Sequence, residues 1–409
     1  MKRSQRRLGE NSRAVHLPEP TTPRQVPIGL PIWRSAAWTF DSTSQQADVL
    51  AEHIPGYAYS RIDNPTVAAF AAGVASLEGA AAPEDVAGQA FSSGMAAINA
   101  VLMTFLRAGS HVVAPAPVHG ATYSLLANVL SRFGVSADFV DYADLRRVRG
   151  AVRTSTKILY AETLANPTMA VADIRGLYRV AREAGALLVV DSTFATPVVC
   201  RPLEHGADLV VHSATKYLGG HDDCMGGVVV GRPDLIGQLR EVRIDTGASL
   251  SPDDAFLLRR GLETLPLRVR RMCSTAMVFA AAIAKHPAVR RVDYPGLPSH
   301  RGHQLARQLF DSGPEGTRFG AVVTVTPHGG YAAGVALADA LQMARIATSM
   351  GGTHTKVAHL ASVTRADEAL SGVDAGAVRF AIGLEDAEDL IADATQALDA
   401  LRSVSPSRG

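Results

Sequence analysis

The chain of 409 residues is 47% hydrophobic and 19% charged, and its formal net charge at pH 7 is +1. This composition predicts a globular protein of two or three domains, and the near-neutral charge argues against nucleic acid or a membrane as partner. Three scattered cysteines are too few for a disulfide framework or a zinc site, so we expect no metal and a reducing, cytoplasmic compartment. No apolar stretch approaches the roughly 18 residues of a membrane span.

Residues 1–63 and 64–260 differ in their pattern. Residues 1–63 are rich in proline, serine, threonine and aromatic residues without sustained periodicity, which predicts an extended N-terminal arm. Residues 64–260 alternate apolar strands with helices, an order that predicts a large α/β domain with a mainly parallel sheet. The expected strands begin at His111, Ala137, Lys157, Leu187, Leu209 and Gly226, and helices such as those from Gly94 and Ile174 lie between them.

Residues 261–409 are predicted to form a smaller C-terminal α+β domain. A long helical stretch from about 252 to 285 leads into it, and we expect a break at Pro266 because proline removes a helical hydrogen bond. A strand from Ala321 and a final helix from about Asp386 complete the pattern.

Lys216 has the most unusual local sequence. The chain has only five lysines, and the remaining 35 of its 40 basic residues are arginines. Lys216 follows the apolar strand LVVHSA and precedes a turn at Gly219 and Gly220. A lysine at a buried strand end has a lowered pKa and can form a Schiff base with a carbonyl cofactor. This segment alone also allows a surface lysine.

Other candidate residues lie where ligands bind in such sheets, beyond the carboxyl ends of the strands. Asp191 ends the strand from Leu187, and Ser213 and Thr215 lie three residues and one residue before Lys216. Each could be an ordinary strand-end residue.

The segment FSSGMAAINAV, from Phe91, passes from a strand end into a helix. Backbone N–H groups at the helix start, at Gly94 and Met95, can bind a phosphate. An aldehyde requires Lys216, and a protonated pyridine nitrogen requires Asp191. Together these features indicate pyridoxal 5'-phosphate (PLP) as the cofactor.

Several motifs, in this order, resemble the cystathionine γ-synthase and methionine γ-lyase family of PLP-dependent enzymes, from about Ile28 to the last helix. They are GYAYSRIDNPT (from Gly56), FSSGMAA, ETLANPT (from Glu162), VDSTFATP (from Val190), HSATKYLGGH (from His212), DYPGLPSH (from Asp293), TSMGG (from Thr348) and VRFAIGLED (from Val378). The resemblance implies the aspartate-aminotransferase-like (type I PLP) fold with a mainly parallel, seven-stranded sheet.

The resemblance also implies roles for individual residues. Lys216 would hold the cofactor and act as base at Cα, and Asp191 would hold the pyridine nitrogen. Tyr59 and Arg61 would bind the phosphate of a neighbouring subunit's cofactor, which implies a homodimer with shared sites and usually a tetramer. The other cofactor-binding residues would be Gly94, Met95, His119, Thr193, Ser213 and Thr215. The carboxylate of a small amino-acid substrate would be bound by Asn166, Ser349 and Arg379.

Three positions depart from the family pattern. His119 stands where relatives usually have a tyrosine that stacks on the cofactor and moves protons near the leaving group. The two side chains differ in acidity, because imidazole has a reference pKa of about 6.5 and phenol one of about 10. Tyr123 could replace that phenol only if the loop shifted. His354 replaces a glutamate that contacts long substrates in many relatives, which weakens the case for cystathionine as the substrate. Ala121 replaces the cysteine of some methionine γ-lyases, which weakens that assignment too.

The expected reaction is elimination or replacement at Cγ of a methionine- or homoserine-like amino acid. We favour a C–S lyase because GYAYSRIDNP resembles the lyase version most. The alternative is a γ-replacement transferase like cystathionine γ-synthase or O-acylhomoserine sulfhydrylase. An aminotransferase is disfavoured by the Tyr59 and Lys216 motifs, and an inactive cofactor-binding scaffold by the presence of Lys216, Asp191 and Arg379.

Overall fold

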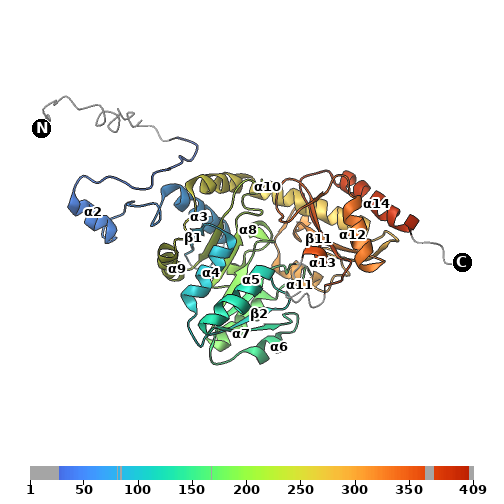
Figure 1. Cartoon of the computed structure of the whole chain (residues 1–409), viewed down its shortest axis with the longest axis horizontal. Coiled ribbons are helices and arrows are strands. Elements are labelled where there is room, and N and C mark those ends of the chain that lie inside the picture. Colours follow the sequence, from blue (N-terminus) through green and yellow to red (C-terminus); the bar gives the residue numbers. More distant parts are fainter. Residues whose placement is uncertain (1–26, 81, 83–84, 167, 364–372, 405–409) are drawn as a thin grey trace. The chain divides into compact units, whose positions relative to one another are not determined.

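The computed structural model describes residues 27–80, 82, 85–166, 168–363 and 373–404 (Figure 1). The chain divides into two units, Met1–Pro31 and Ile32–Gly409, and every element discussed below belongs to the second. The predicted N-terminal arm lies partly outside the described residues. Its later part is not extended throughout, because helix α2 (Thr43–Leu50) begins after Ser42, whose side chain accepts a hydrogen bond from the N–H of Gln45.

Seven strands form the main sheet, in the order β1-β7-β6-β5-β4-β2-β3. They are β1 (Ala87–Phe91), β2 (His111–Pro115), β3 (Ser136–Val140), β4 (Thr156–Glu162), β5 (Leu187–Asp191), β6 (Leu209–Ser213) and β7 (Gly227–Gly231). All neighbours are parallel except β7, which is antiparallel to both β6 and β1. The mainly parallel, seven-stranded sheet is therefore confirmed. The sequence predicted a strand end at Phe91, where β1 ends, but not the bounds of this strand, because AGQAF lacks the β-branched residues typical of strands.

The main sheet is buried on both faces. In β4, Leu159 and Ala161 belong to one hydrophobic core and Ile158 and Tyr160 belong to the other. This alternation follows from the two-residue period of a strand, and burial on both faces explains the nearly continuous apolar runs in the sequence.

Helices of the large domain cover both faces of the main sheet. The first core includes residues of α3 (Pro65–Glu78), α7 (Ile174–Ala184) and α10 (Pro252–Ile283), and the second includes residues of α4 (Gly94–Phe105) and α9 (Pro233–Thr246). The predicted helices from Gly94 and Ile174 are confirmed as α4 and α7. Helix α6 (Leu145–Ala151) contacts α7 and β3, and α5 (Gly120–Ser124) contacts α4. The short segments are η1 (Leu125–Val129), η2 (Leu130–Phe133), α8 (Thr196–Val199) and η3 (Pro202–His205).

The predicted break at Pro266 is wrong. Helix α10 is one helix of 32 residues that contains Pro266. Leu262, Leu265 and Val269 on either side of the proline are at most 5% exposed, so packing maintains the helix despite the missing N–H donor. The helix also crosses residue 260, where the sequence predicts the boundary between domains, and that boundary stays a prediction.

A second sheet, in the order β12-β13-β14-β11-β8, organises the C-terminal domain. Its strands are β8 (Val289–Asp293), β11 (Val322–Pro327), β12 (Arg345–Ile346), β13 (Lys356–His359) and β14 (Val378–Ala381). The other elements are α11 (His303–Leu309), β9 (Ser312–Gly313), β10 (Gly316–Thr317), α12 (Gly330–Ala340), α13 (Leu360–Val363) and α14 (Ala387–Val404). Figure 1 shows α12 beside α14 at the C-terminal end of the colour range. The predicted strand from Ala321 and the final helix correspond to β11 and α14.

The register of the main sheet aligns the polar strand ends. Glu162 of β4 pairs with Asp191 of β5, and Asp191 pairs with Val211 of β6, two residues before Ser213. Because these strands are parallel, their carboxyl ends meet at one edge of the sheet. Within the described ranges, no helix has the length and apolar character needed to cross a bilayer.

Candidate active site

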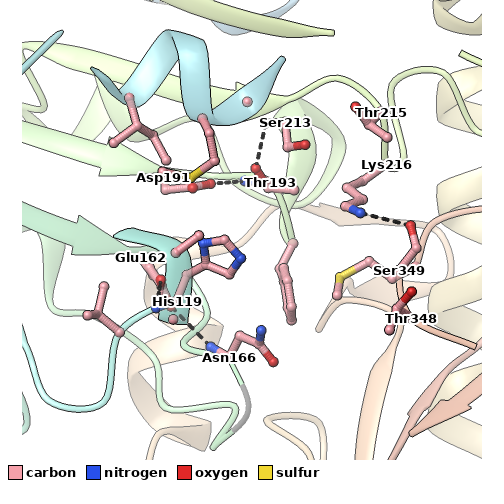
Figure 2. A pocket seen from close by; sticks show the side chains of 18 of the residues that line it. His119, Glu162, Asn166, Asp191, Thr193, Ser213, Thr215, Lys216, Thr348 and Ser349 are labelled. Atoms are coloured by element: carbon pink, nitrogen blue, oxygen red, sulfur yellow. Dashed lines mark hydrogen bonds between the residues drawn. The ribbon is translucent and has the colours of Figure 1, made fainter. Parts of the chain in front are cut away.

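A cavity of about 580 Å³ opens at this edge of the sheet (Figure 2). Its walls come from the ends of β4, β5 and β6, from the starts of α4 and α5, and from the residues around Ser349 and Arg379 in the C-terminal domain. The structure brings most predicted site residues together here. The cavity is lined by Gly94, Met95, His119, Asn166, Asp191, Thr193, Ser213, Thr215, Lys216, Ser349 and Arg379.

The Lys216 side chain crosses from the large domain toward the C-terminal domain. Its Nζ donates a hydrogen bond of 2.8 Å to Ser349 Oγ. Burial lowers the pKa of Lys216, and the positive charges of Arg379 and Lys356 lower it further. Ser349 has a φ of +92°, a region that non-glycine residues rarely adopt, so its position opposite the lysine is held under backbone strain. A larger neutral fraction of this amine favours its action as nucleophile and base.

Hydrogen bonds fix Asp191 at the end of β5. Its Oδ1 accepts a bond of 2.9 Å from the N–H of Thr193, and its Oδ2 accepts one of 3.3 Å from the hydroxyl of Tyr160. The Thr193 Oγ1 in turn accepts a bond of 2.8 Å from the N–H of Ser213 (Figure 2). These contacts join the ends of β4, β5 and β6 and aim a fixed carboxylate into the cavity.

The start of α4 forms the anion-binding part of the site. Ser93 caps the helix by accepting a bond of 3.1 Å from the N–H of Ala96, whereas the first N–H groups of a helix have no intrahelical acceptor. Gly94 lies so close to β6 that an added Cβ would be 2.7 Å from Ser213 Cβ. The glycine therefore lets a bound phosphate reach the helix start and the hydroxyls of Ser213 and Thr215 together.

Arg379 supplies a cation on the opposite wall. The residue is 8% exposed, its Nη1 donates a bond of 3.0 Å to Asn166 Oδ1, and its Nη2 lies 3.5 Å from the carbonyl oxygen of Ser349. Among the described residues, its buried Nε has no hydrogen-bond partner. Burial lowers the pKa of Arg379. An incompletely paired, buried guanidinium fits a carboxylate ligand, since two parallel N–H groups bind two carboxylate oxygens.

Glu162 is a site residue that the sequence did not single out. Its two carboxylate oxygens accept bonds of 2.7 Å from the N–H of His119 and 3.1 Å from the N–H of Asn166. Burial and the nearby Asp191 raise the pKa of Glu162 to about 8, against the effect of the two N–H donors. Its place at a strand end in ETLANPT was the available signal, but the two contacts depend on the folding of separate loops.

Of the three residues that depart from the family pattern, His119 and Ala121 line the cavity and His354 does not. The His119 Nδ1 is 3.3 Å from Thr122 Oγ1, and Ala121 and Tyr123 also line the cavity. The ring of Tyr123 packs against Phe139, with 4.7 Å between the ring centroids. His354 is not among the residues that line the cavity.

Tyr59 and Arg61 do not line the cavity that holds Lys216 of their own chain. Tyr59 is 46% exposed, and the guanidinium carbon of Arg61 lies 5.7 Å from the centroid of its ring. Arg61 also donates a bond of 2.9 Å to the carbonyl oxygen of Ile244. A role for these two side chains in this site therefore needs a second subunit.

The cavity and the fold define a class of protein. The doubly covered sheet, a lysine at the end of β6, a fixed carboxylate at the end of β5 and a helix start open to phosphate match the requirements of a PLP-dependent enzyme. The observation that tests the fit is Gly94, whose missing Cβ lets the start of α4 and the Ser213 hydroxyl lie side by side, as a shared phosphate site requires. In the described part of the chain, no group of three potential ligand side chains could hold a metal ion.

Residues 11–399 match a family described as Cys/Met metabolism PLP-dependent enzyme, and the chain belongs to this family. An L-methionine gamma-lyase of Pseudomonas putida is 42% identical over 377 residues, or 90% of this chain and 92% of that protein. An O-succinylhomoserine sulfhydrylase of Pseudomonas aeruginosa is 38% identical over 378 residues, or 91% of each chain.

A solved structure of an O-acetylhomoserine (thiol)-lyase from Campylobacter jejuni has the same fold. Its TM-score is 0.86 at 29% identity, and the match covers 93% of this chain and 97% of that one. That structure carries N'-pyridoxyl-lysine-5'-monophosphate. The expected family, fold class and cofactor are thereby confirmed: the chain is a PLP-dependent enzyme.

The assignment of Lys216 can be tested by chemical trapping. Borohydride reduction of the purified protein should fix the cofactor to Lys216 alone, because this lysine is buried in the cavity and its pKa is lowered. Peptide mapping by mass spectrometry is the measurement. Lys157→Ala and Lys285→Ala serve as controls that should keep the label, and a label found on either lysine in the parent would overturn the assignment.

Proposed function

We propose that this chain is a C–S lyase that eliminates the γ-substituent of a methionine-like amino acid. The observation that carries the proposal is the convergence of Lys216, Asp191 and the incompletely paired Arg379 on one cavity. The L-methionine gamma-lyase at 42% identity supports the choice of substrate. We include cytoplasmic localisation in the proposal, because Cys200, Cys224 and Cys273 are all free.

The residues of the site suit successive tasks in such a reaction. Bound PLP would supply an electron sink for the negative charge that develops at Cα. Arg379 and Asn166 would hold the substrate carboxylate, which directs the Cα–H bond toward Lys216. Lys216, with its lowered pKa, would remove the Cα proton, and Asp191 would keep the pyridine nitrogen protonated. His119 would exchange a proton on the side of the cavity where the γ-substituent leaves.

The alternative is a γ-replacement transferase. The O-succinylhomoserine sulfhydrylase at 38% identity supports it, because sulfhydrylases replace the γ-substituent by a sulfur nucleophile. Both reactions use the same Lys216, Asp191 and Arg379, so the difference between them lies in the access of a thiol to the cavity.

Product analysis separates these functions. Incubation with L-methionine should give an α-keto acid, ammonia and methanethiol, detected by mass spectrometry. Acylated homoserines with and without added thiol test the alternative, and homocysteine and cystathionine test the substrate range. Formation of a new thioether amino acid in place of keto acid would establish the transferase. Amino exchange with pyruvate, without loss of the γ-substituent, would contradict both and indicate an aminotransferase.

We further propose a homodimer with shared active sites, assembled as a tetramer. The proposal is supported by Tyr59 and Arg61, which lie away from the cavity of their own chain and pair with each other by a cation–π contact. In this arrangement they bind the cofactor phosphate of the neighbouring subunit.

Subunit complementation tests this assembly. Arg61→Ala and Lys216→Ala should each be nearly inactive, but hybrids of the two should regain activity, because one of the two sites in each hybrid dimer keeps both residues. Random mixing would restore at most about a quarter of the parent's sites, since about half of the dimers are hybrids with one intact site. Hybrids shown to form by mass spectrometry but lacking activity would contradict the shared site.

His119 generates a prediction about pH. If the imidazole is the acid or base near Cγ, the pH profile of kcat should contain a limb that His119→Phe removes. His119→Phe keeps a ring that can stack, so it should retain the cofactor but lose roughly 10²- to 10⁴-fold in kcat. His119→Tyr should move the pH dependence upward. A His119→Phe profile that overlays the parent's at a similar rate would show that the ring only packs.

A further inference from the structure

One buried carboxylate connects two loops that the proposed reaction uses separately. Glu162 ends β4, and its Oε1 accepts a bond of 2.7 Å from the N–H of His119, at the start of α5. Its Oε2 accepts a bond of 3.1 Å from the N–H of Asn166, in the loop that follows β4. Figure 2 marks the hydrogen bonds of Glu162 with His119 and Asn166 by dashed lines. Each oxygen thus holds the backbone of a different loop.

Each of the two loops carries a side chain into the cavity. His119 lines the side that contains the start of α5, and Asn166 lines the side of Arg379. Asn166 Oδ1 accepts a bond of 3.0 Å from Arg379 Nη1. A continuous series of hydrogen bonds therefore runs from the backbone of His119 through Glu162 and Asn166 to the guanidinium of Arg379.

The Glu162 carboxyl group is buried beside a second acidic side chain, and both features oppose its ionisation. The residue is 7% exposed, and it pairs in register with Asp191 on the neighbouring strand. The charged or titratable groups around it are Asp191 and Tyr160 on the sheet and His119 on the adjoining loop. Burial and Asp191 act against the ionised form, whereas the two backbone N–H groups favour it. Each carboxyl oxygen of Glu162 accepts one backbone N–H, so the two loops account for the orientation of this side chain.

We propose that Glu162 is a positioning residue that sets the distance between the acid–base ring of His119 and the carboxylate-binding pair Asn166–Arg379. The proposal rests on the proposed function, since it assigns the two loops to opposite ends of one substrate. Glu162 also lines the cavity, but both of its carboxyl oxygens already accept backbone N–H groups of the two loops. It acts by holding both loops with one rigid carboxylate at the end of a sheet strand.

Glu162→Gln is the informative variant. It keeps the volume of the side chain, but its amide offers only one acceptor oxygen and turns an NH₂ group toward the other backbone N–H. We expect one loop to move, with a loss in kcat/KM of roughly tenfold to hundredfold, because a misplacement of about 1 Å can cost up to about 10²-fold. KM should rise together with the fall in kcat. Glu183→Gln, on an exposed helix position, is the matched control and should leave both parameters unchanged.

Two further measurements separate positioning from a merely structural role. In a double-mutant cycle with His119→Phe, the cost of Glu162→Gln in kcat should be smaller than in the parent, because the ring that it positions has been removed. Binding of norleucine, a methionine analogue without a sulfur leaving group, should weaken about tenfold, as followed by the visible spectrum of the holoenzyme. This binding measurement does not require turnover, so it remains valid if the C–S lyase proposal fails.

Glu162→Asp provides a second test should the glutamine variant not fold. It keeps the carboxyl group with both oxygens but withdraws them by one methylene, so norleucine binding should weaken here also. Norleucine affinity equal to the parent's in a folded Glu162 variant, with effects on kcat that add to those of His119→Phe, would show that Glu162 serves the fold alone and would overturn the proposal.

Discussion

The in-register pairing of parallel strands β4, β5 and β6 is the constraint on which the site depends. The strands are largely apolar on both faces, and Glu162, Asp191 and Ser213 stand where each strand ends. Because Glu162 pairs with Asp191, and Asp191 with Val211, the two carboxylates lie side by side, two residues from Ser213. A slip of one residue would turn either carboxylate toward the opposite face.

Acidic and basic side chains are then separated across the cavity. The carboxylates of Asp191 and Glu162 belong to the main sheet, whereas Arg379 belongs to the C-terminal domain, and Lys216 reaches between them to Ser349. Burial opposes the charged form of Glu162, Lys216 and Arg379, raising the pKa of the carboxyl group and lowering the pKa values of the two basic groups. A substrate with both an amine and a carboxylate can relieve part of this cost on binding, which favours amino acids as substrates.

His119 illustrates how a substitution can be accommodated without rebuilding the site. The contact that fixes its loop comes from its backbone N–H and Glu162, and is independent of the side chain. The identity of the ring can therefore change from the phenol usual in relatives to an imidazole while the loop keeps its anchor. The positions of Lys216, Asp191 and Arg379 depend on other contacts.

Local sequence determined much of this protein. Two-residue and helical periodicity predicted six of the seven main-sheet strands and the helices α4 and α7, and the residues at strand ends predicted Lys216, Asp191 and the phosphate site. Tertiary structure decided the rest. Strand β1 forms because β7 pairs with it, and α10 continues through Pro266 because its apolar face is buried. The role of Glu162 and the separation of Tyr59 and Arg61 from the cavity depend on contacts between distant segments, which no local pattern encodes.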